Sequence, residues 1–275
     1  MKPAPFTYHA ANSSPEAVSL LTKEAPPRIL AGGQSLIPML NLRLAPADAL
    51  LDITRIPELR AVEETGDAVR YGALTTHAAF EDGLVPDASN GLMRRVAGNI
   101  AYRAVRTRGT IGGAIALADP AADWVTASIA LEAVLHLQSA SGKRQMPIEE
   151  FILGPYFTAL SEGELIFAIE VPKRSTSEHW GYHKVVVKTG EYAESMAIAL
   201  LDRARGSARI VLGATDGAPI VMKRAAVALI RGADNAALKT AVAMDLAAVE
   251  HEFSAAKRIL HTTTVLRAAK DASTS

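Results

Sequence analysis

The sequence contains no cysteine in its 275 residues. Without thiols, the chain cannot form disulfides, use a catalytic cysteine, or hold zinc or an iron–sulfur cluster through thiolates of its own. It also lacks a net charge, because 29 Lys and Arg residues balance 29 Asp and Glu residues. A neutral balance gives no electrostatic reason to expect binding to nucleic acid or to an anionic membrane. It also removes one obstacle to association with other chains.

Long apolar runs are missing as well. No segment approaches the ~18 uninterrupted apolar residues of a membrane helix, so no transmembrane segment is expected. The first nine residues, MKPAPFTYH, lack the apolar core of a signal peptide, and we therefore expect a cytoplasmic protein. With 49% hydrophobic and 21% charged residues, the composition is typical of a globular protein.

Turn and strand signals divide the chain into three predicted parts, residues 1–56, 57–173 and 178–275. The polar run at residues 173–178 contains no apolar side chain and separates the second part from the third. Apolar stretches predict strands at 28–31, 49–53, 69–73, 134–138, 165–171, 183–188, 195–202 and 208–214. Helices are predicted from Ser13 until Pro26, after Gly32-Gly33, from Thr75 or Thr76 to Phe80, at 86–96, at 121–133, and in two or three segments within 222–271.

Two short glycine-rich segments carry the strongest local signals for ligand binding. Residues 31–36 read AGGQSL and follow a predicted strand, and residues 109–114 read GTIGGA. Glycine lets a ligand approach the backbone closely, and successive N–H groups form an anion site. With the hydroxyls of Ser35 and Thr110, the two segments could hold one diphosphate from two sides. Neither segment matches a known nucleotide fingerprint, so simple turns are the alternative interpretation.

Several polar candidates fit structural roles better than chemical ones. His179 and His183 fall on one face of an extended segment, and without a third ligand they do not predict a metal site. Asp119 and Asp123 flank Pro120 in a predicted turn, which favours capping and hydrogen bonding over acid–base chemistry.

Two further groups of side chains have more than one interpretation. Arg103, Arg106 and Arg108 could bind phosphate, or they could face solvent or a partner subunit. Four apolar residues that follow the first glycine segment are expected in the core rather than in a cofactor site: Met39, Leu40, Leu42 and Leu44.

Both glycine segments belong to longer motifs. The first continues from AGGQSLIP at 31–38 to NLRL at 41–44 and LDI at 51–53, and the second runs from RTRGTIGG at 106–113 to ADPAAD at 118–123. With Gly190-Glu191-Tyr192-Ala193, these motifs resemble the FAD-binding medium subunits of molybdenum hydroxylases. The resemblance covers about residues 4–270, in the family's order and spacing. In three places the chain departs from the family's usual residues, with Trp124 for a smaller aliphatic residue, Glu191 for Asp and Lys188 for Arg.

The resemblance implies an α+β fold. It would be an FAD-binding fold of the vanillyl-alcohol-oxidase type with two α/β subdomains, followed by a C-terminal three-stranded sheet with a helical bundle. FAD would be the cofactor of this chain, and no side chain would be catalytic or bind metal. The residues implied to bind FAD are Arg28, Ala31, Gly32, Gly33, Gln34, Ser35, Leu36, Ile100, Ala101, Val105, Thr110, Gly112, Gly113, Ala114, Asp123, Leu165, Ile166, Lys184, Lys188 and Tyr192.

The resemblance also assigns parts of the cofactor to these residues. Residues 31–36 would hold the diphosphate with Arg28 nearby, and Asp123 would accept a hydrogen bond from a ribityl or ribose hydroxyl. Tyr192 would lie near a face of the isoalloxazine, and Lys184 or Lys188 near its carbonyl edge.

As to function, the resemblance implies the FAD-carrying electron-transfer subunit of a heterotrimeric molybdenum hydroxylase. A large subunit with a molybdopterin cofactor would oxidise the substrate, and a small subunit with two [2Fe-2S] clusters would pass electrons to this FAD. A dimer of heterotrimers is expected, and the substrate and the final acceptor stay open. The alternatives are a self-contained FAD-dependent oxidoreductase of the same superfold and a scaffold module that binds no flavin.

Overall fold

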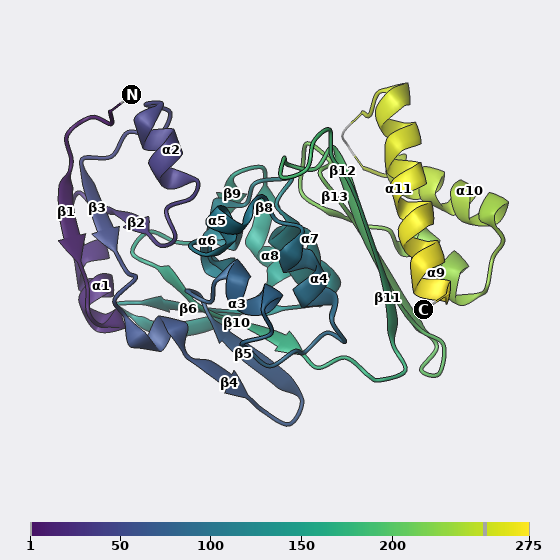
Figure 1. The fold of residues 1–275 in the computed structure, drawn as a ribbon, viewed down its shortest axis with the longest axis horizontal. Coiled ribbons are helices and arrows are strands. Elements are labelled where there is room, and N and C mark those ends of the chain that lie inside the picture. The colour runs from purple at the N-terminus through teal and green to yellow at the C-terminus, as the bar shows by residue number, and fades with distance from the viewer. Residues whose placement is uncertain (1, 250–251, 275) are drawn as a thin grey trace.

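The computed structural model describes residues 2–249 and 252–274, in which three larger sheets, one two-stranded hairpin and the surrounding helices make up the fold (Figure 1). Each sheet lies within one of the three predicted parts of the chain. We propose those parts as domains. No helix in the described ranges is both long enough and apolar enough to cross a membrane.

The first sheet is parallel, with the strand order β1-β3-β2. Its elements are β1 (Thr7–Ala10), α1 (Ser14–Leu21), β2 (Arg28–Leu30), α2 (Leu36–Asn41) and β3 (Ala49–Asp52). Ser13 caps α1 as predicted, since its Oγ accepts a hydrogen bond from the N–H of Glu16. The helix already ends at Leu21, five residues before the predicted end at the Pro26-Pro27 pair. The strand β1, which pairs with β3 at the edge of the sheet, was not predicted from the sequence.

The second sheet is antiparallel, with the order β4-β5-β10-β6-β7. Its strands are β4 (Val62–Glu64), β5 (Ala68–Gly72), β6 (Val134–Ser139), β7 (Gly142–Pro147) and β10 (Leu165–Pro172). The helices of this part are η1 (Pro57–Arg60), α3 (His77–Glu81), α4 (Leu92–Gly98), α5 (Arg103–Arg106), α6 (Ile111–Leu117), α7 (Asp123–Ala130) and α8 (Ile148–Phe151). A small hairpin joins β8 (Ile152–Gly154) to β9 (Phe157–Thr158).

Three predictions for this second part were wrong in their bounds or type. The helix predicted from residue 86 begins only at Leu92, because Asn90 and Gly91 both have a positive φ that a right-handed helix cannot continue. The helix predicted at 121–133 is shorter, Asp123–Ala130. The second glycine segment is largely helical, since α6 begins at Ile111 behind the Thr110 cap.

The third sheet has the order β11-β12-β13-β14. The predicted long strands are present as β11 (His179–Val185), β12 (Ser195–Asp202) and β13 (Ser207–Gly213), with the short β14 (Ile220–Val221) beside them. The first of these begins and ends earlier than the predicted 183–188. Three helices follow, α9 (Lys223–Ile230), α10 (Asn235–Leu246) and α11 (Ala255–Thr274).

This third sheet is covered on both faces, as Figure 1 shows. On one face, Ile198, Leu200 and Val211 join the core around α4 and α7. On the other face, Ala197 and Leu212 alternate with them and pack under α9, α10 and α11. Two-sided burial explains why every residue of β12 is buried. The sheet therefore joins the C-terminal helices to the second part of the chain.

A glycine sets how closely α11 approaches this sheet. A Cβ built on Gly181 of β11 would overlap the carbonyl oxygen of Ala268 on α11. We predict that Gly181→Ala lowers the free energy of unfolding by about 2 kcal/mol, because overpacking forces the helix away from the sheet. Urea denaturation measures this change. Gly66→Ala, in an exposed hairpin with nothing within 4 Å of the added Cβ, is the matched control. Equal midpoints for the two variants would contradict the packing argument.

Candidate functional site

One large cavity, of about 650 Å³, lies where the three parts of the chain meet. This volume falls within the usual range of ligand pockets. The cavity is lined from the first part by residues 31–36, from the second by residues 109–110, 112–114 and 122–124, and from the third by residues 190–192. Of the twenty residues implied to bind FAD, all but Lys188 line it. Lys188 is exposed, so the structure favours Lys184 of the two lysines.

The first glycine segment lines this cavity, and its backbone amides have no partner among the described residues. It forms the turn between β2 and α2, and Gly33 has φ +73°, a conformation that favours glycine. The backbone N–H groups of residues 32 to 36 donate to no atom in the part of the chain that the structure describes. Five neighbouring donors of this kind suit an anionic group such as a diphosphate.

The second glycine segment differs from the sequence expectation. Most of its N–H groups are used internally: Ile111 donates to the carbonyl of Thr75, Gly112 to that of Ala73, and Gly113 to the Thr110 side chain. Its glycines serve close packing instead, since a Cβ on Gly112 would lie 2.5 Å from the Ala73 Cβ. This segment therefore brings few free amides to the cavity.

The two segments touch at their backbones. A Cβ on Gly32 would overlap the carbonyl oxygen of Arg108 and lie 2.9 Å from the Gly109 Cα. The close contact needs a residue without a side chain, and it sets the distance between the first and second parts of the chain at the cavity floor.

A buried ionic cluster forms one wall. Asp123, the first residue of α7, is 6% exposed, and its carboxylate lies 2.8 Å from Lys184 Nζ. The Tyr182 hydroxyl donates to the other carboxylate oxygen at 2.5 Å, and Lys184 also donates to the Asn99 carbonyl. Burial raises the pKa of Asp123, and the charge and hydrogen bonds of Lys184, with the Tyr182 hydroxyl, partly offset that rise. The cluster places one anionic and one cationic group at the cavity.

His77 is a cavity residue that the sequence analysis missed. It begins α3 behind the Thr76 cap, is 5% exposed, and accepts a hydrogen bond at Nδ1 from the Trp124 indole N–H at 2.9 Å. Burial, with a smaller contribution from Arg106, lowers the pKa of His77 to about 4, so the ring is neutral at pH 7. No spacing or motif singles out His77, because its partner lies 47 residues away in the sequence.

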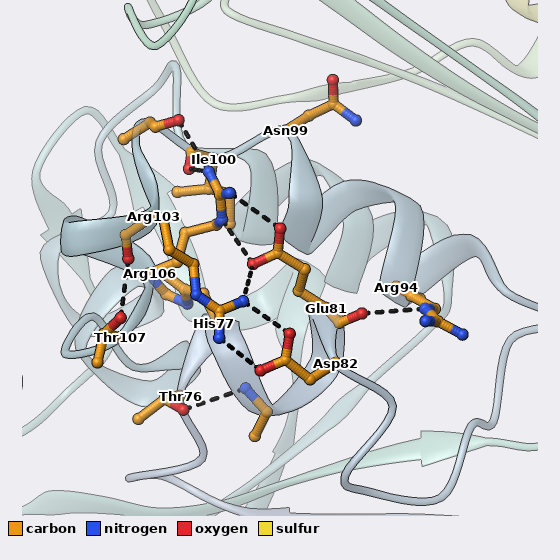
Figure 2. Close-up of polar contacts among 12 residues, drawn as sticks. Thr76, His77, Glu81, Asp82, Arg94, Asn99, Ile100, Arg103, Arg106 and Thr107 are labelled. Atoms are coloured by element: carbon orange, nitrogen blue, oxygen red, sulfur yellow. Dashed lines mark hydrogen bonds and ion pairs between the residues drawn. The ribbon is translucent and has the colours of Figure 1, made fainter.

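Two of the three arginines near the second segment, Arg103 and Arg106, pair with groups of the chain itself (Figure 2), whereas Arg108 is exposed. Arg106 forms a two-pronged ion pair with Glu81 and donates to the carbonyls of Ile100 and Ala101, both of which line the cavity. Arg103 pairs with Glu81 and Asp82. These hydrogen bonds, first from Arg106 and then from Arg103, hold the pKa of Glu81 below its usual range.

Asp119 and the four apolar residues after the first glycine segment agree only in part with their predicted roles. Asp119 accepts a hydrogen bond from the Ala121 N–H within the turn, as the predicted hydrogen-bonding role requires, but it does not cap α7, whose N-cap residue is Ala122. Of the four apolar residues expected in the core, Leu40 is buried and Met39 lines the cavity, but Leu42 and Leu44 are exposed. The expectation for Leu42 and Leu44 was wrong because α2 has only six residues and ends before them.

No group of three or more potential ligand side chains that could hold a metal ion occurs in residues 2–249 and 252–274. His183 Nε2 instead lies 3.2 Å from the Arg267 guanidinium.

We predict that Arg106→Gln lowers the free energy of unfolding by about 2 kcal/mol, because two cavity-lining carbonyls and Glu81 lose their donor. Chemical denaturation of the chain measures the loss. Arg103→Gln is the matched control, because Arg103 is 51% exposed against 12% for Arg106, and it should cost less. A larger loss of unfolding free energy in the Arg103→Gln variant would contradict the proposed role of Arg106 in holding residues 100–101.

Residues 4–174 match the family model described as the FAD binding domain in molybdopterin dehydrogenase. The carbon monoxide dehydrogenase medium chain of Hydrogenophaga pseudoflava is 39% identical over 226 residues, which is 82% of this chain and 79% of the relative. The glyceraldehyde dehydrogenase medium chain of Sulfolobus acidocaldarius is 41% identical over 201 residues, which is 73% of this chain and 71% of the relative.

Solved structures agree along the whole chain. A carbon monoxide dehydrogenase from Hydrogenophaga pseudoflava superposes with a TM-score of 0.92 at 35% identity, covering 99% of this chain and 98% of the other. Quinoline 2-oxidoreductase from Pseudomonas putida 86 gives a TM-score of 0.91 at 30% identity, with the same coverage of 99% and 98%. These matches confirm the family and the α+β flavin-binding fold that the sequence motifs indicated. The chain therefore belongs to the family of FAD-binding medium subunits of molybdenum hydroxylases.

Proposed function

We propose that this chain is the electron-transfer subunit of a multi-subunit molybdenum hydroxylase, with FAD held in the cavity between its three parts. The observation that carries the proposal is the row of free amides at residues 32–36, in a segment that lines a cavity whose other walls hold Asp123, Lys184 and Tyr192. When bound, FAD supplies the redox chemistry, accepting electrons and passing them on.

The residues of the chain would bind and orient the cofactor. The amides of residues 32–36 suit the diphosphate, as donors to an anion. Asp123 has acceptor capacity left for a sugar or ribityl hydroxyl, because a carboxylate has about four lone-pair sites and two protein donors use part of them. Lys184 brings a cation to the same wall, and Leu165 and Ile166 bring apolar surface. Such a site positions the ring and tunes its potential, with no side chain acting as acid, base or nucleophile.

The relatives support a relay rather than substrate chemistry in this chain. Their names describe medium chains or subunits of enzymes for carbon monoxide, nicotine, glyceraldehyde and caffeine. Substrates this different, served by similar medium chains, suggest that a partner chain oxidises the substrate. We infer a large molybdopterin subunit and a small subunit with two [2Fe-2S] clusters as partners, assembled as a dimer of heterotrimers. The predicted cytoplasmic location is part of the same proposal.

We predict that the purified chain binds one FAD and shows a flavin absorption spectrum. Gly33→Glu or Gly113→Glu should weaken FAD binding roughly a hundredfold or more, because a carboxylate beside the diphosphate adds like-charge repulsion. Titration with FAD measures the affinity. Gly66→Glu places the same charge on an exposed hairpin and should bind as the wild type does. FAD binding at full stoichiometry and affinity in both cavity variants would contradict the loop assignment, and a folded wild-type chain that takes up no FAD would favour the scaffold alternative.

We also predict that the isolated chain, loaded with FAD, oxidises none of the substrates for which its relatives are named. Its flavin should be reduced only when a reduced iron–sulfur partner is supplied. Anaerobic mixing with each substrate, followed by the loss of flavin absorbance, measures this. Turnover by the chain alone at a rate comparable with a complete hydroxylase would support the self-contained oxidoreductase instead.

A further inference from the structure

The imidazole of His77 has one edge open to the cavity floor. Its backbone N–H donates to the Gly109 carbonyl at 2.9 Å, so the ring lies under the second glycine segment. A Cβ on Gly109 would lie 2.6 Å from His77 Nε2 and 2.7 Å from Cδ2. The lack of a side chain at Gly109 therefore leaves the Nε2 edge uncovered, and His77 is one of the residues that line the cavity.

Trp124 determines which ring nitrogen of His77 carries the proton. An indole N–H can only donate, so Nδ1 of His77 must accept the hydrogen bond from Trp124. Because the low pKa keeps the ring neutral, its single N–H is at Nε2. Within the described ranges, this N–H makes no hydrogen bond. His77 is only 5% exposed, so a buried side chain presents an unused donor at the cavity.

The position of this donor identifies the part of a ligand that it would meet. The backbone contact of Gly32 with Arg108 and Gly109 brings the free amides of the first segment next to the Gly109 backbone, which lies beside the Nε2 edge of His77. The second segment uses most of its own amides internally, which leaves this side of the floor short of donors. A neutral N–H here faces the anion that the first segment would hold.

We propose that His77 donates a hydrogen bond from Nε2 to the diphosphate of bound FAD, and that Trp124 acts as a positioning residue that fixes the required tautomer. The inference rests on the proposed function, because it assumes FAD in this cavity. It assigns roles to two residues that neither the glycine motifs nor the resemblance singled out as ligands. It also gives a purpose to Trp124, which replaces a smaller aliphatic residue of the family.

Two amide substitutions test the roles of the two ring nitrogens of His77 independently. His77→Asn keeps a polar group near the Nδ1 position for Trp124 but removes the donor at Nε2. His77→Gln extends an amide N–H to the Nε2 position and should restore the contact. Calorimetric titration of the full chain with FAD and with ADP should show both ligands bound roughly tenfold more weakly by His77→Asn, and within about threefold of wild type by His77→Gln.

ADP is included because it carries the diphosphate without the flavin. Wild-type affinity of His77→Asn for both ligands would overturn the proposal. So would a loss for FAD without a loss for ADP, because the contact would then lie near the flavin. If the wild-type chain bound neither FAD nor ADP, the proposed function itself would fail, which is a different result.

A measurement on the wild-type chain keeps the test independent of variant folding. Nitrogen-15 NMR of the His77 ring should show Nε2 protonated and Nδ1 unprotonated, with and without FAD. Addition of FAD should move the Nε2–H proton downfield and slow its exchange with water. Trp124→Phe should weaken this tautomer preference and lower the affinity for FAD and ADP together. An Nε2–H signal that FAD leaves unchanged would overturn the proposal.

Discussion

The site depends on one backbone contact, in which Gly32 lies against the carbonyl of Arg108. Any side chain at residue 32 would separate the turn after β2 from the segment before α6, and the cavity floor would open. The contact joins a parallel sheet to an antiparallel one that has its own core. The free amides of residues 32–36 can therefore face a wall made by a different part of the chain.

The third part of the chain is tied to the same cavity by buried charge. Lys184 on β11 reaches Asp123 at the start of α7, and Tyr182 on the same strand donates to the other carboxylate oxygen. An ion pair this deeply buried contributes little net stability, but losing one partner leaves an uncompensated charge, so the pair selects one arrangement of strand and helix. The other face of the sheet β11-β12-β13 packs against the C-terminal helices, so the ion pair also fixes where those helices lie.

Much of the fold could be predicted from local patterns, and the exceptions have physical causes. Capped helices such as α1 and continuous apolar strands such as β12 follow from their own residues. The helical state of Gly112 could not be predicted, because glycine disfavours helices and the close packing against Ala73 is a contact distant in the sequence. The exposure of Leu42 and Leu44 depends on where α2 ends, which apolar periodicity does not determine. His77 and Arg106 gain their roles from partners distant in the sequence.

Because the cavity walls come from all three parts of the chain, a ligand held there couples the stabilities of those parts. A molecule that binds only the assembled site adds RT ln(1 + [L]/Kd) to the free energy of unfolding, or about 2.7 kcal/mol at a hundred times Kd. Without that ligand, the sheets are joined at the cavity by the glycine contact, the Asp123–Lys184 pair and the apolar surface around them. A newly made chain without flavin would thus open more often and be more accessible to proteases before it met its partners. Binding of the cofactor would therefore favour the survival of chains that are ready to assemble.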